Sequence, residues 1–537
     1  MRSSCGRAIL TDAVVPRRID APLPTRNCFA VCPHYLTTAI PYPSGEPHVG
    51  HTFEMIAADA MARYRRLRGE DVFLLGGLDE NSQRVSRAAR EAGLGPQDFA
   101  DVAAPRYLTA WESVDVTFDD FVRTSEPRHH ESVRAFYDRV LENGDIYKGR
   151  YEGWYCFRCE VFYADGELVD KKCPIHETRP EWVEEDNYFF ALSKYEERLL
   201  DLYERCPGFV QPETRRNEML GFLHQGLRDF SISRSGATWG IPLPNDSEHR
   251  IYVWFDALIN YLTGLEFGQD TGTGRFDRYW PANVHVIGKD IVRFHAIYWP
   301  AMLMAAGLEL PLQIRVHGWV SFAGTELSQS GGHVVKPGEV IERFGSDALR
   351  YFLLREVAFD RDGDFTWEAM ARRYQDDLGN DLGNLVLRST SMLSRYFDGV
   401  LPETDDVTEL ESELRAAEQK AWARTSDHFE HWRFHRALVA TWQYISAVNQ
   451  YIDRTAPWKL ARDDANRPRL QTVLHVVLDA ISRIATMIRP VMPRTADSIE
   501  KQLGLTGQTV PWGGHSGTLT AGHVVPGGSA LFPRLDE

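Results

Sequence analysis

Residues 39–51 read A-I-P-Y-P-S-G-E-P-H-V-G-H, and this stretch decides the fold of the chain. The run from Tyr35 to Ile40 that leads into it is short and apolar, as a buried strand is. After it, apolar residues recur at helical spacing until Gly69 supplies a stop signal. His48 and His51 are therefore predicted to lie at a strand-to-helix turn, where the N–H groups of a helix N-terminus attract phosphates.

The two histidines, with Gly50 between them, suit a nucleotide-activating site. Imidazoles held at a helix N-terminus can donate hydrogen bonds to charge that develops on an α-phosphate. The competing interpretation is a pair of ordinary loop histidines, because a four-residue pattern such as H-x-G-H also arises by chance. The strand-to-helix setting favours the nucleotide site.

With these motifs, the chain resembles the methionyl-tRNA synthetases, a family of class I aminoacyl-tRNA synthetases, from about Phe29 to the C-terminus. The H-I-G-H signature of that family contacts ATP, and its positions here are His48, Val49, Gly50 and His51. The resemblance implies catalytic roles for His48, Gly50 and His51. It also implies an α/β fold: a doubly wound, Rossmann-like parallel-sheet catalytic domain, split by a zinc-knuckle insertion and followed by an all-α anticodon-binding helix bundle.

The resemblance and the hydrophobic patterns together give an expected domain organisation. Helical patterns replace alternating strands and helices from about Met370 to about Leu503, and such a change marks a domain boundary. The expected parts are an N-terminal extension (1–28), the first half of the catalytic domain (29–145), the connective insertion with the zinc knuckle (146–250), the second half of the catalytic domain (251–320), a stem-contact region (321–375), the helical anticodon-binding domain (376–505) and a C-terminal segment (506–537).

Composition is consistent with a large intracellular protein. A chain of 537 residues is too long for one domain, and its hydrophobic fraction of 43% supports sizeable cores. No apolar run approaches the roughly 20 residues of a membrane span. We therefore expect no membrane contact, a cytoplasmic location and a monomer. The net charge of −16 disfavours a uniformly basic nucleic-acid binder, but local patches can still bind tRNA phosphates. Candidate patches are the Arg-rich faces around Arg350, Arg355, Arg372 and Arg373.

Three cysteines and one histidine are arranged as C-x2-C-x13-C-x2-H, a pattern typical of zinc sites. The predicted ligands are Cys156, Cys159, Cys173 and His176. The segment between the two pairs has an Asp-Gly turn between apolar residues, as a hairpin in a zinc knuckle would. A site with four protein ligands is structural, because it leaves no position for a reacting water. The competing interpretation is a set of buried cysteines without a metal.

A second strand is predicted from Val72 to Leu75, and Asp79 follows near its end. Parallel sheets bind ligands at the carboxyl ends of their strands, so Asp79 is placed to meet a substrate ammonium group. By resemblance, Asp79 takes the position that holds the α-amino group of methionine. Taken alone, it would be a loop or cap carboxylate. The family usually has His and Gly where this chain has Asn81 and Ser82, which alters the local loop.

Sheet-forming sequence resumes from Ile251 to Trp254, and helical spacing follows. Such a pattern by default indicates core packing. The resemblance instead implies the wall of a methionine pocket, made by Ile40, Tyr42, Trp254, Ala257, Leu258, Tyr261, Phe294 and His295. An apolar, aromatic pocket suits the polarizable thioether of methionine.

A further buried strand is predicted from Val284 to Ile287. Gly288, Lys289 and Asp290 follow at its carboxyl end, where glycine permits close approach of the backbone and a carboxylate can accept from ribose hydroxyls. In the family this G-K-D segment contacts the adenosine of ATP, so all three residues are predicted to bind ATP.

The chief departure from the family is the segment E-L-S-Q-S at residues 326–330. The family has its second signature, K-M-S-K-S, in this place, and its lysines neutralise the β- and γ-phosphates as pyrophosphate leaves. Here Glu326 and Gln329 replace the lysines, so activation is expected to be slower. The resemblance still implies catalytic roles for Ser328 and Ser330 and ATP binding by Gln329. Candidates for replacement charge are Arg293, His333 and Lys336.

Three residues of the helical region match the family positions that read the CAU anticodon. Asn384 and Arg388 are four apart and share one helix face, and Trp458 follows a proline much later in the chain. An aromatic ring can stack on an unstacked base, and polar side chains can bond its edges. The competing interpretation is interhelical packing.

The leading hypothesis is a methionyl-tRNA synthetase activity, which uses ATP with magnesium as a substrate, L-methionine, a tRNA with a CAU anticodon and one structural zinc ion. No P-loop is evident, and the interval from Gly144 to Arg250 is too short for the editing insertion of the leucyl, isoleucyl and valyl relatives. The alternative is a divergent paralogue that binds tRNA or methionine with weak or no aminoacylation activity, because its second signature has lost both lysines.

Overall fold

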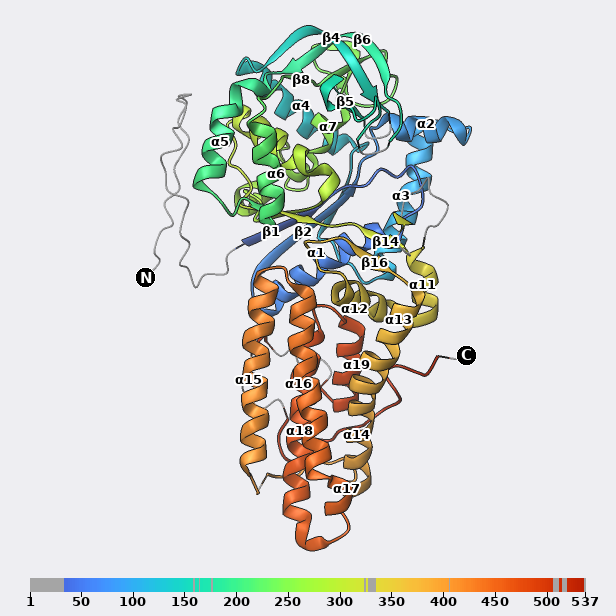
Figure 1. Ribbon diagram of the computed structural model, residues 1–537, viewed down its shortest axis with the longest axis vertical. Coiled ribbons are helices and arrows are strands. Elements are labelled where there is room, and N and C mark those ends of the chain that lie inside the picture. The colour runs from blue at the N-terminus through green and yellow to red at the C-terminus, as the bar shows by residue number, and fades with distance from the viewer. Residues whose placement is uncertain are drawn as a thin grey trace. The chain divides into compact units, whose positions relative to one another are not determined.

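The structure is a computed structural model, and it describes residues 33–157, 160–163, 165–174, 177–322, 325–326, 335–404, 406–505, 511–513 and 519–535. Its described part contains a parallel sheet surrounded by helices and, later in the chain, a bundle of long helices (Figure 1). This arrangement confirms the predicted α/β class with a helical C-terminal part.

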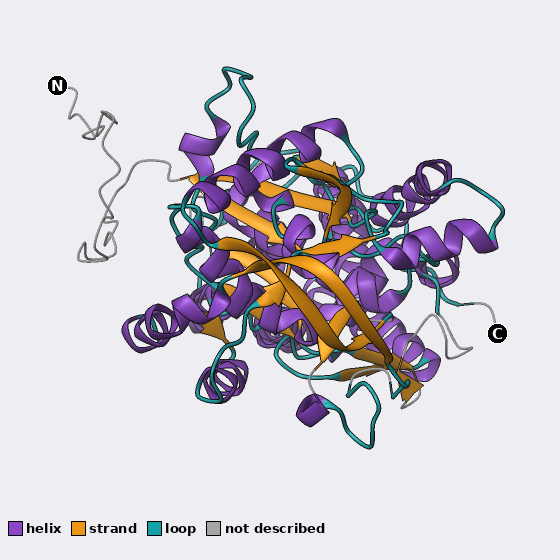
Figure 2. Ribbon diagram, turned by 90° about the horizontal axis from the view of Figure 1, so that it is seen from above, coloured by secondary structure: helices purple, strands orange, loops and turns teal. Residues whose placement is uncertain are grey.

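The central sheet is entirely parallel and has the strand order β3-β2-β1-β12-β13-β7. Figure 2 shows strands of the molecule with helices around them. Strands buried on both faces are near-continuous apolar runs, as in β2 and β12. Its strands are β1 (Pro33–Thr38), β2 (Asp71–Leu78), β3 (Asp120–Arg123), β7 (Val210–Gln211), β12 (Val284–Gly288) and β13 (Ile314–His317).

The order of connection reverses between β1 and β12, which are neighbours in the sheet. The chain leaves β1 through helix α1 toward β2 on one side, whereas β12 continues to β13 on the other side. A crevice forms at the carboxyl ends of strands where the order reverses, and ligands of doubly wound sheets bind there. The predicted H-V-G-H and G-K-D segments follow these two central strands.

Helix α1 (Val49–Leu67) begins and ends where the sequence predicts. His48 is its N-cap residue with an extended backbone, and Gly69 after the C-cap has a φ of +80°, which glycine adopts without strain. The other helices of this part are α2 (Gln83–Glu91), α3 (Pro96–Ser113), α4 (Pro127–Glu142), α8 (Asn260–Thr263), α9 (Arg275–Tyr279) and α10 (Trp299–Ala305), the last preceded by a π-helical turn η4 (Phe294–Tyr298).

The described residues of the segment predicted as an insertion form two antiparallel sheets and two α-helices, and they also give the short edge strand β7 to the central sheet. The larger sheet has the order β5-β4-β6-β8 and the smaller one β10-β11-β9. Its elements are β4 (Ile146–Cys156), β5 (Val161–Tyr163), β6 (Glu181–Phe190), α5 (Glu196–Arg205), α6 (Glu213–Leu223), β8 (Phe230–Ser231), β9 (Ser233–Ser235), β10 (Pro242–Leu243) and β11 (Asp246–Ile251).

The strand predicted from Ile251 to Trp254 is wrong beyond its first residue. Strand β11 ends at Ile251, and Trp254 lies in the short helix α7 (Val253–Ala257). The N–H groups of Phe255 and Asp256 both bond to the carbonyl of Tyr252, which starts a turn. A short apolar run does not distinguish a strand from a buried helical turn, so tertiary contacts decided the outcome.

A small sheet of order β15-β14-β16 and two helices follow the central sheet. The chain passes backbone to backbone at Gly318, where an added Cβ would lie 2.1 Å from the carbonyl carbon of Arg361. Only glycine fits this crossing without displacing the main chain. The elements are β14 (Val320–Phe322), β15 (Thr325–Glu326), α11 (Pro337–Phe344), α12 (Ser346–Glu356) and β16 (Gly363–Phe365).

From residue 367 to residue 503 the described elements are helices, as predicted (Figure 1). The most apolar of them, α18, has the length and composition of a membrane span, but 78% of its most apolar window is buried against the other helices. The helices are α13 (Trp367–Arg373), the π-helix η5 (Tyr374–Gly383), α14 (Asn384–Phe397), α15 (Glu409–Glu430), α16 (Phe434–Thr455), α17 (Pro457–Leu460), α18 (Arg467–Ile488) and α19 (Pro493–Leu503).

Candidate active site at the carboxyl ends of β1 and β12

His48 and His51 lie against each other at the start of α1. Their rings are stacked with centroids 3.7 Å apart, and Nδ1 of His51 accepts a hydrogen bond of 3.4 Å from the backbone N–H of His48. The Nε2 of a neutral His51 then carries the proton and is a donor. A Cβ on Gly50 would lie 3.0 Å from the His48 ring, so glycine leaves this ring in its place.

Both imidazoles are neutral donors in the free protein. Burial lowers the pKa of His48 to about 4, and burial together with nearby His48 and Arg84 lowers the pKa of His51 well below its usual value. Each histidine therefore keeps one N–H to offer to an anion without carrying a charge of its own.

Asp79 lies at the end of β2, beside the loop that precedes α1. Its backbone N–H bonds to the carbonyl of Pro41 at 3.1 Å, which brings the carboxylate close to Tyr42. The side chain is 2% exposed, and its Oδ1 has no hydrogen-bond partner. Burial, with the negative groups Asp256, Glu160 and Glu80 nearby, raises the pKa of Asp79 well above its usual value. A buried carboxylate with an open oxygen suits a bound cation.

Ile40 and Tyr42 lie on the loop between β1 and α1, next to Asp79. A Cβ on Gly77 would lie 2.8 Å from Cγ2 of Ile40, so this glycine lets Ile40 approach β2 closely. Tyr42 has a buried hydroxyl without a hydrogen-bond partner, and the guanidinium of Arg84 lies 5.1 Å from its ring centroid. The structure thus brings three predicted methionine-binding residues together at one strand end.

The aromatic residues predicted for the pocket wall are also in contact. The rings of Trp254 and Phe294 are parallel within 1°, with centroids 3.7 Å apart. The hydroxyl of Tyr261 and Nε2 of His295 are 2.7 Å apart, and Nδ1 of His295 lies 3.1 Å from the carbonyl of Ile291. Burial lowers the pKa of His295 to about 4, so its neutral ring donates to the carbonyl and accepts from Tyr261.

Ala257 and Leu258 are also buried. They lie at the end of α7, between Trp254 and Tyr261 in the sequence. One partner of this wall was missed by the sequence reasoning: His285 of β12, whose ring stacks on Tyr261 at 4.3 Å. His285 lies 2.6 Å from Oγ1 of Thr37 and accepts from the indole of Trp299 at 3.1 Å. The sequence signal that could have revealed this contact is a histidine inside an apolar strand, because a buried polar group needs hydrogen-bond partners.

The G-K-D segment lies at the end of β12, as predicted. A Cβ on Gly288 would lie 2.6 Å from Oδ1 of Asp290, so glycine gives this carboxylate room. Asp290 accepts from the indole of Trp319 at 3.3 Å. Lys289 is 2.6 Å from the carboxylate of Asp362, and its Nζ lies 4.2 Å from the Trp319 ring centroid. Lys289 is therefore held between the carboxylate of Asp362 and the ring of Trp319.

Glu54 and His317 form a buried ion pair that sequence reasoning missed. Nε2 of His317 lies 2.7 Å from Oε2 of Glu54, and Oε1 of Glu54 accepts from the backbone of Ala39 at 2.6 Å. Burial lowers the pKa of His317, but its contact with Glu54 outweighs this and leaves the pKa raised. The pair fixes α1 to β13 and to the end of β1. The sequence signal that could have revealed this pair is Glu54, a charged residue among the apolar residues of the predicted helix.

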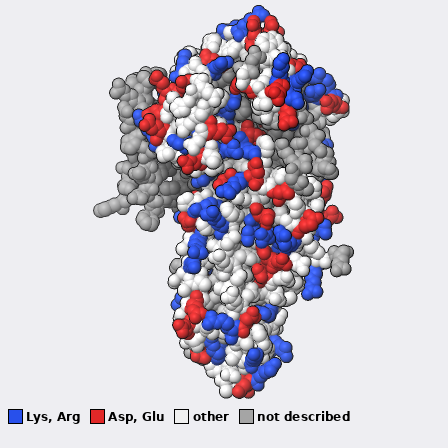
Figure 3. Space-filling model, in the orientation of Figure 1, with Lys and Arg blue, Asp and Glu red and all other residues white. Residues whose placement is uncertain are grey.

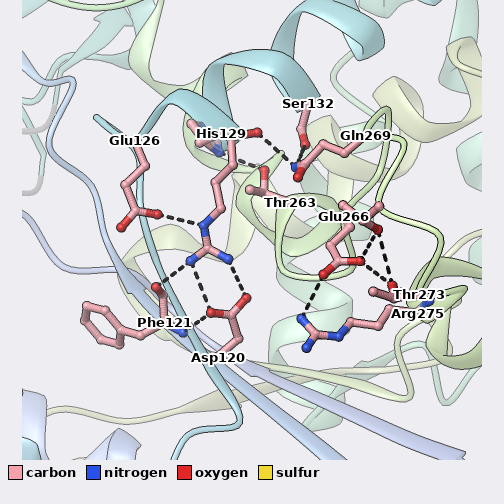
Figure 4. A network of polar contacts seen from close by, with 12 residues as sticks. Asp120, Phe121, Glu126, His129, Ser132, Thr263, Glu266, Gln269, Thr273 and Arg275 are labelled. Carbon is pink, nitrogen blue, oxygen red and sulfur yellow. Dashed lines mark hydrogen bonds and ion pairs between the residues drawn. The ribbon is translucent and has the colours of Figure 1, made fainter.

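A second buried network holds α7 behind the pocket. Oδ2 of Asp256 accepts from Asn81 at 3.0 Å, and Oδ1 of Asp256 lies 2.9 Å from Nε2 of His129. His129 of α4 also contacts Oγ1 of Thr263 at 2.9 Å (Figure 4). Asn81 is one of the two residues of the loop after β2 where the chain departs from the usual family sequence, and here it bonds the carboxylate of Asp256 in α7.

Figure 4 also shows how the start of α4 is fixed to β3 and to the segment after α8. The guanidinium of Arg128 bonds to Asp120 at 2.7 Å, to Glu126 at 2.7 Å and to the carbonyl of Phe121 at 2.8 Å. Ser132 donates to the carbonyl of Phe267 at 2.7 Å. These bonds keep His129 in place toward the pocket wall.

Two of the four predicted zinc ligands lie among the described residues. Cys156 ends β4 and Cys173 follows the hairpin, and they are 2% and 1% exposed in one hydrophobic cluster. Cys173 bonds backbone to backbone with Thr178, whose Oγ1 lies 3.9 Å from the sulfur of Cys156. Cys159 and His176 lie outside the described residues. Among the residues described, no three potential ligands form a metal site.

The altered second signature lies mostly outside the description: Leu327, Ser328, Gln329 and Ser330 are not among the described residues, nor is His333. Its flanks are described. Glu326 belongs to β15, and the carbonyl of Val335 accepts from the backbone N–H of Val49 at 3.1 Å. Val335, which follows the second signature, is thus bonded to the first residue of α1, beside the H-V-G-H turn.

The other candidates for replacement charge already have acidic partners. Lys336 lies 3.9 Å from Glu46 on the loop before α1. Arg293 lies 3.3 Å from Glu167 and 4.1 Å from the ring centroid of Phe222. Lys336 is 52% exposed and is therefore the more accessible of the two.

The three predicted anticodon residues lie on α14 and α17, which contact each other through Arg388 and Trp458. The guanidinium of Arg388 on α14 is 5.9 Å from the ring centroid of Trp458 on α17 and 3.5 Å from Asp453. Asn384 is exposed one turn before Arg388 on the same face of α14, and Trp458 is 37% exposed. The structure brings an exposed ring and two polar side chains to neighbouring helices.

Among the candidate basic residues, Arg350 is not a surface residue. Its side chain is fully buried and pairs with the buried Asp59 at 2.6 Å. Helical spacing did not reveal this, because it does not show which Arg of a helix has a buried acid opposite. Arg373 pairs with Glu356 and Asp377, whereas Arg372 is exposed. On the face in Figure 3, Lys and Arg side chains form patches between acidic ones.

Comparison with known proteins agrees with this geometry. Residues 34–178 and 166–390 match the family described as tRNA synthetases class I (M), and residues 401–537 match the anticodon binding domain of methionyl tRNA ligase. The methionine–tRNA ligase of Caldanaerobacter subterraneus is 46% identical over 94% of this chain and 79% of that protein. That of Streptomyces coelicolor is 42% identical over 94% of this chain and 97% of that protein.

Solved structures agree as well. The Mycobacterium tuberculosis methionyl-tRNA synthetase in complex with methionyl-adenylate is 41% identical, covers 94% of this chain and 100% of its own, and superposes with a TM-score of 0.91. The apo form of the same enzyme gives a TM-score of 0.83 over 94% of this chain. With two matching family domains, this level of identity and the H-V-G-H crevice described above, the chain belongs to the methionyl-tRNA synthetase family of class I aminoacyl-tRNA synthetases.

Proposed function

We propose that the chain activates L-methionine with ATP and transfers it to tRNA carrying a CAU anticodon. In the first step a carboxylate oxygen of methionine attacks the α-phosphorus, the bond to the bridging oxygen breaks, and pyrophosphate leaves. In the second step a hydroxyl of the tRNA 3′-terminal ribose attacks the carbonyl carbon, and AMP leaves. Both steps need orientation and charge stabilisation rather than a covalent protein nucleophile.

The observation that carries this proposal is the open carboxylate oxygen of Asp79 beside the aromatic wall. A buried carboxylate oxygen without a hydrogen-bond partner is costly unless a ligand supplies a positive charge. The ammonium of methionine supplies it, and the thioether then lies against aromatic rings such as those of Trp254, Tyr261 and Phe294. Ile40, Tyr42, Ala257, Leu258 and His295 complete the proposed pocket.

We propose that His48 and His51 donate to the α-phosphate as charge develops on it. Their lowered pKa values support neutral N–H donors, which need no proton from solvent to act. Gly288 and Asp290 are proposed to hold the nucleoside, because Asp290 stands at a strand end beside a glycine. Lys289 is proposed to contact ATP, which enters with magnesium, after exchanging its contact with Asp362.

The altered second signature favours one specific alternative, a paralogue with weak or no aminoacylation. The replacement of two lysines by Glu326 and Gln329 removes positive charge from the place where pyrophosphate leaves. Ser328, Gln329 and Ser330 keep their predicted roles in our proposal. Lys336 is the best candidate for compensation, since it is exposed and close to the start of α1.

Methionine-dependent exchange of pyrophosphate into ATP separates the two functions. We expect exchange with the purified chain. The double variant Glu326→Lys/Gln329→Lys should raise the exchange rate by about 10-fold or more, because it restores two phosphate contacts. No exchange above the background of an Asp79→Asn variant would reject the activation step. Charging of a CAU transcript, compared with one of another anticodon, then tests transfer to tRNA.

Asn384, Arg388 and Trp458 are proposed to read the anticodon. Their support is the grouping of an exposed aromatic ring on α17 with two polar side chains on one face of α14. One chain carries both the proposed activation site and the proposed anticodon surface. We therefore expect the protein to act as a monomer. A cytoplasmic location remains our expectation, since that is where tRNA charging for protein synthesis takes place.

We also propose one structural zinc ion held by Cys156, Cys159, Cys173 and His176. The two described cysteines fit this role because both are buried and both contact Thr178, Cys156 through its sulfur and Cys173 through its backbone N–H. The ion would hold the two ligand pairs together and would supply no chemistry to the reaction. Metal analysis of protein purified without chelator should find about one zinc per chain, and a chain free of zinc would reject this site.

A further inference from the structure

A widened helical turn lies directly before the proposed anticodon helix. Segment η5 (Tyr374–Gly383) is π-helical, and the N–H of Asn384 bonds to the carbonyl of Gly379, five residues earlier. An α-helix bonds four residues back, so a π-helical stretch holds more residues per turn. The number of residues in this stretch therefore fixes the direction in which the side chains of α14 point.

Two side chains of α16 donate to the backbone of this stretch. The indole Nε1 of Trp442 bonds to the carbonyl of Asp377 at 3.2 Å, and Nδ2 of Asn449 bonds to the carbonyl of Asp381 at 3.1 Å. The two donors are seven residues apart and so lie on one face of α16. The carbonyls of Asp377 and Asp381 thus each accept a side-chain hydrogen bond from α16, and these two bonds hold the backbone of η5 against that helix.

The sequence of η5 fits close contacts that a side chain would block. A Cβ on Gly383 would lie 3.0 Å from the carbonyl oxygen of Leu378 and 3.4 Å from the ring of Phe532. The hydroxyl of Tyr374 donates to the carbonyl of Pro533 at 2.9 Å, and its ring centroid is 5.8 Å from that of Phe532. The C-terminal segment thus packs on both ends of the widened stretch.

The orientation of α14 depends on this stretch. The outward stripe of α14 contains Asn384 and Arg388, whereas Leu385 and Val386 are buried. Each residue of an α-helix turns by about 100°, so loss of the widened geometry by one residue would turn this stripe by the same angle. Arg388 would then leave Trp458, over whose ring it now lies.

We propose that η5 sets the rotation of α14 for anticodon reading and that Trp442 and Asn449 are positioning residues that hold it in the π-helical form. The proposal rests on the anticodon roles given above to Asn384 and Arg388. Neither positioning residue needs to touch tRNA. Their effect passes through the backbone of η5 to the exposed face of α14.

The test uses Trp442→Phe, which keeps an aromatic ring against Tyr351 but removes the indole donor, and Asn449→Leu, which removes the amide. Gln450→Leu is the matched control, because it removes an amide from the exposed neighbouring position of the same helix. Each full-length variant is assayed for pyrophosphate exchange, for charging of a CAU transcript, and for charging of a transcript with another anticodon.

We expect each positioning variant to lower kcat/KM for the CAU transcript about 10-fold, mainly through KM, as loss of one buried hydrogen bond would. Exchange should stay at the wild-type rate, and charging of the other transcript should be unchanged, so discrimination is lost. Gln450→Leu should match the wild type in all three assays. General misfolding would instead lower exchange and both charging rates together.

Wild-type discrimination in both positioning variants would overturn the inference. Arg388→Ala and Trp458→Ala distinguish this failure from failure of the proposed function. If those two variants lose CAU discrimination while the positioning variants keep it, only the role of η5 is rejected. If none of the four variants affects discrimination, the anticodon roles themselves are rejected.

Discussion

At the residue scale, the proposed site consists of polar groups kept in unfavourable states by burial. Asp79 has an open oxygen near other carboxylates, and His48 and His51 are neutral rings stacked on each other. Such groups cost stability in the free protein and are compensated when a ligand binds. Substitutions here should therefore affect activity more than folding.

Asp79→Asn should lower kcat/KM for methionine by about 10- to 100-fold, because a charge-assisted hydrogen bond to the ammonium group is lost. The melting temperature should stay the same or rise, since the variant removes one of several buried negative charges. Exchange kinetics and thermal unfolding check the two effects. Equal loss of activity and of melting temperature would mean that Asp79 is a structural residue.

The buried histidines predict how stability depends on pH. Burial lowers the pKa of His295 to about 4, whereas a histidine in the unfolded chain titrates near 6.5. The unfolded state therefore binds more protons as the pH falls below about 6.5, and the folded state loses stability from there down to pH 4. For His295 alone the loss at pH 5 relative to pH 7 is about 2 kcal/mol.

Urea unfolding of the wild type and of His295→Gln at pH 7 and pH 5 measures this contribution. The difference in unfolding free energy between the two pH values should be smaller in the variant by about 2 kcal/mol. His317 has a raised pKa and works in the opposite direction, so it contributes stability that is lost as the pH rises. An unchanged pH dependence in the variant would show that His295 is protonated in the fold.

At the element scale, α1 links the chemistry to the sheet. Its first residue bonds to Val335 after the second signature, and Glu54 on its first turns bonds both to Ala39 and to His317. The helix therefore holds the ends of β1 and β13 and the altered signature at fixed places around His48. A small change at its N-terminus is expected to act on the transition state.

Gly50→Ala should lower kcat for exchange with little change in KM for methionine, because the added Cβ lies 3.0 Å from the His48 ring and displaces it. Gly338→Ala is the matched control: this helical glycine of α11 has open space around its Cβ position. The control should be as active as the wild type and slightly more stable, since alanine favours helices. Steady-state kinetics of pyrophosphate exchange for both variants test this prediction. Equal kcat values for Gly50→Ala and Gly338→Ala would contradict it.

At the scale of the whole molecule, the helical part is joined to the catalytic sheet through α12. Arg350 bonds to Asp59 of α1, to the carbonyl of Val114 after α3, and to the carbonyls of Pro490 and Val491 before α19. Tyr351, the next residue, donates to Asp377 in η5 at 2.6 Å. Two adjacent residues thus contact the helix that carries H-V-G-H and the stretch that precedes α14.

Arg350→Met should destabilise the fold by about 3–5 kcal/mol, because the buried Asp59 keeps only Arg63 as a cationic partner and the carbonyls of Val114, Pro490 and Val491 lose a donor. The double variant Arg350→Met/Asp59→Asn should recover part of that loss, since the buried negative charge opposite the missing guanidinium is then removed as well. Urea unfolding of the wild type and the variants gives these free energies. A loss of less than 1 kcal/mol for Arg350→Met, as surface ion pairs give, would contradict the burial of this pair.

Much of the fold was predictable from local pattern. The strand before Pro41, helix α1 and its stop at Gly69 follow from apolar periodicity and helix-end signals, which depend on neighbours in the sequence. The side chains predicted for the site also lie together, because each follows a parallel strand and the carboxyl ends of such strands meet. Their roles in catalysis remain predictions until the kinetic experiments are done.

The sequence by itself therefore determined the class of fold, the family and the strand ends that carry the candidate residues. Tertiary structure alone decided that Trp254 lies in a helix, that Arg350 is buried against Asp59, and that η5 is π-helical. The physical reason is the same in each case. These outcomes depend on partners far away in the chain, such as His129 for Asp256, Asp59 for Arg350 and Trp442 for Asp377, and local periodicity carries no information about them.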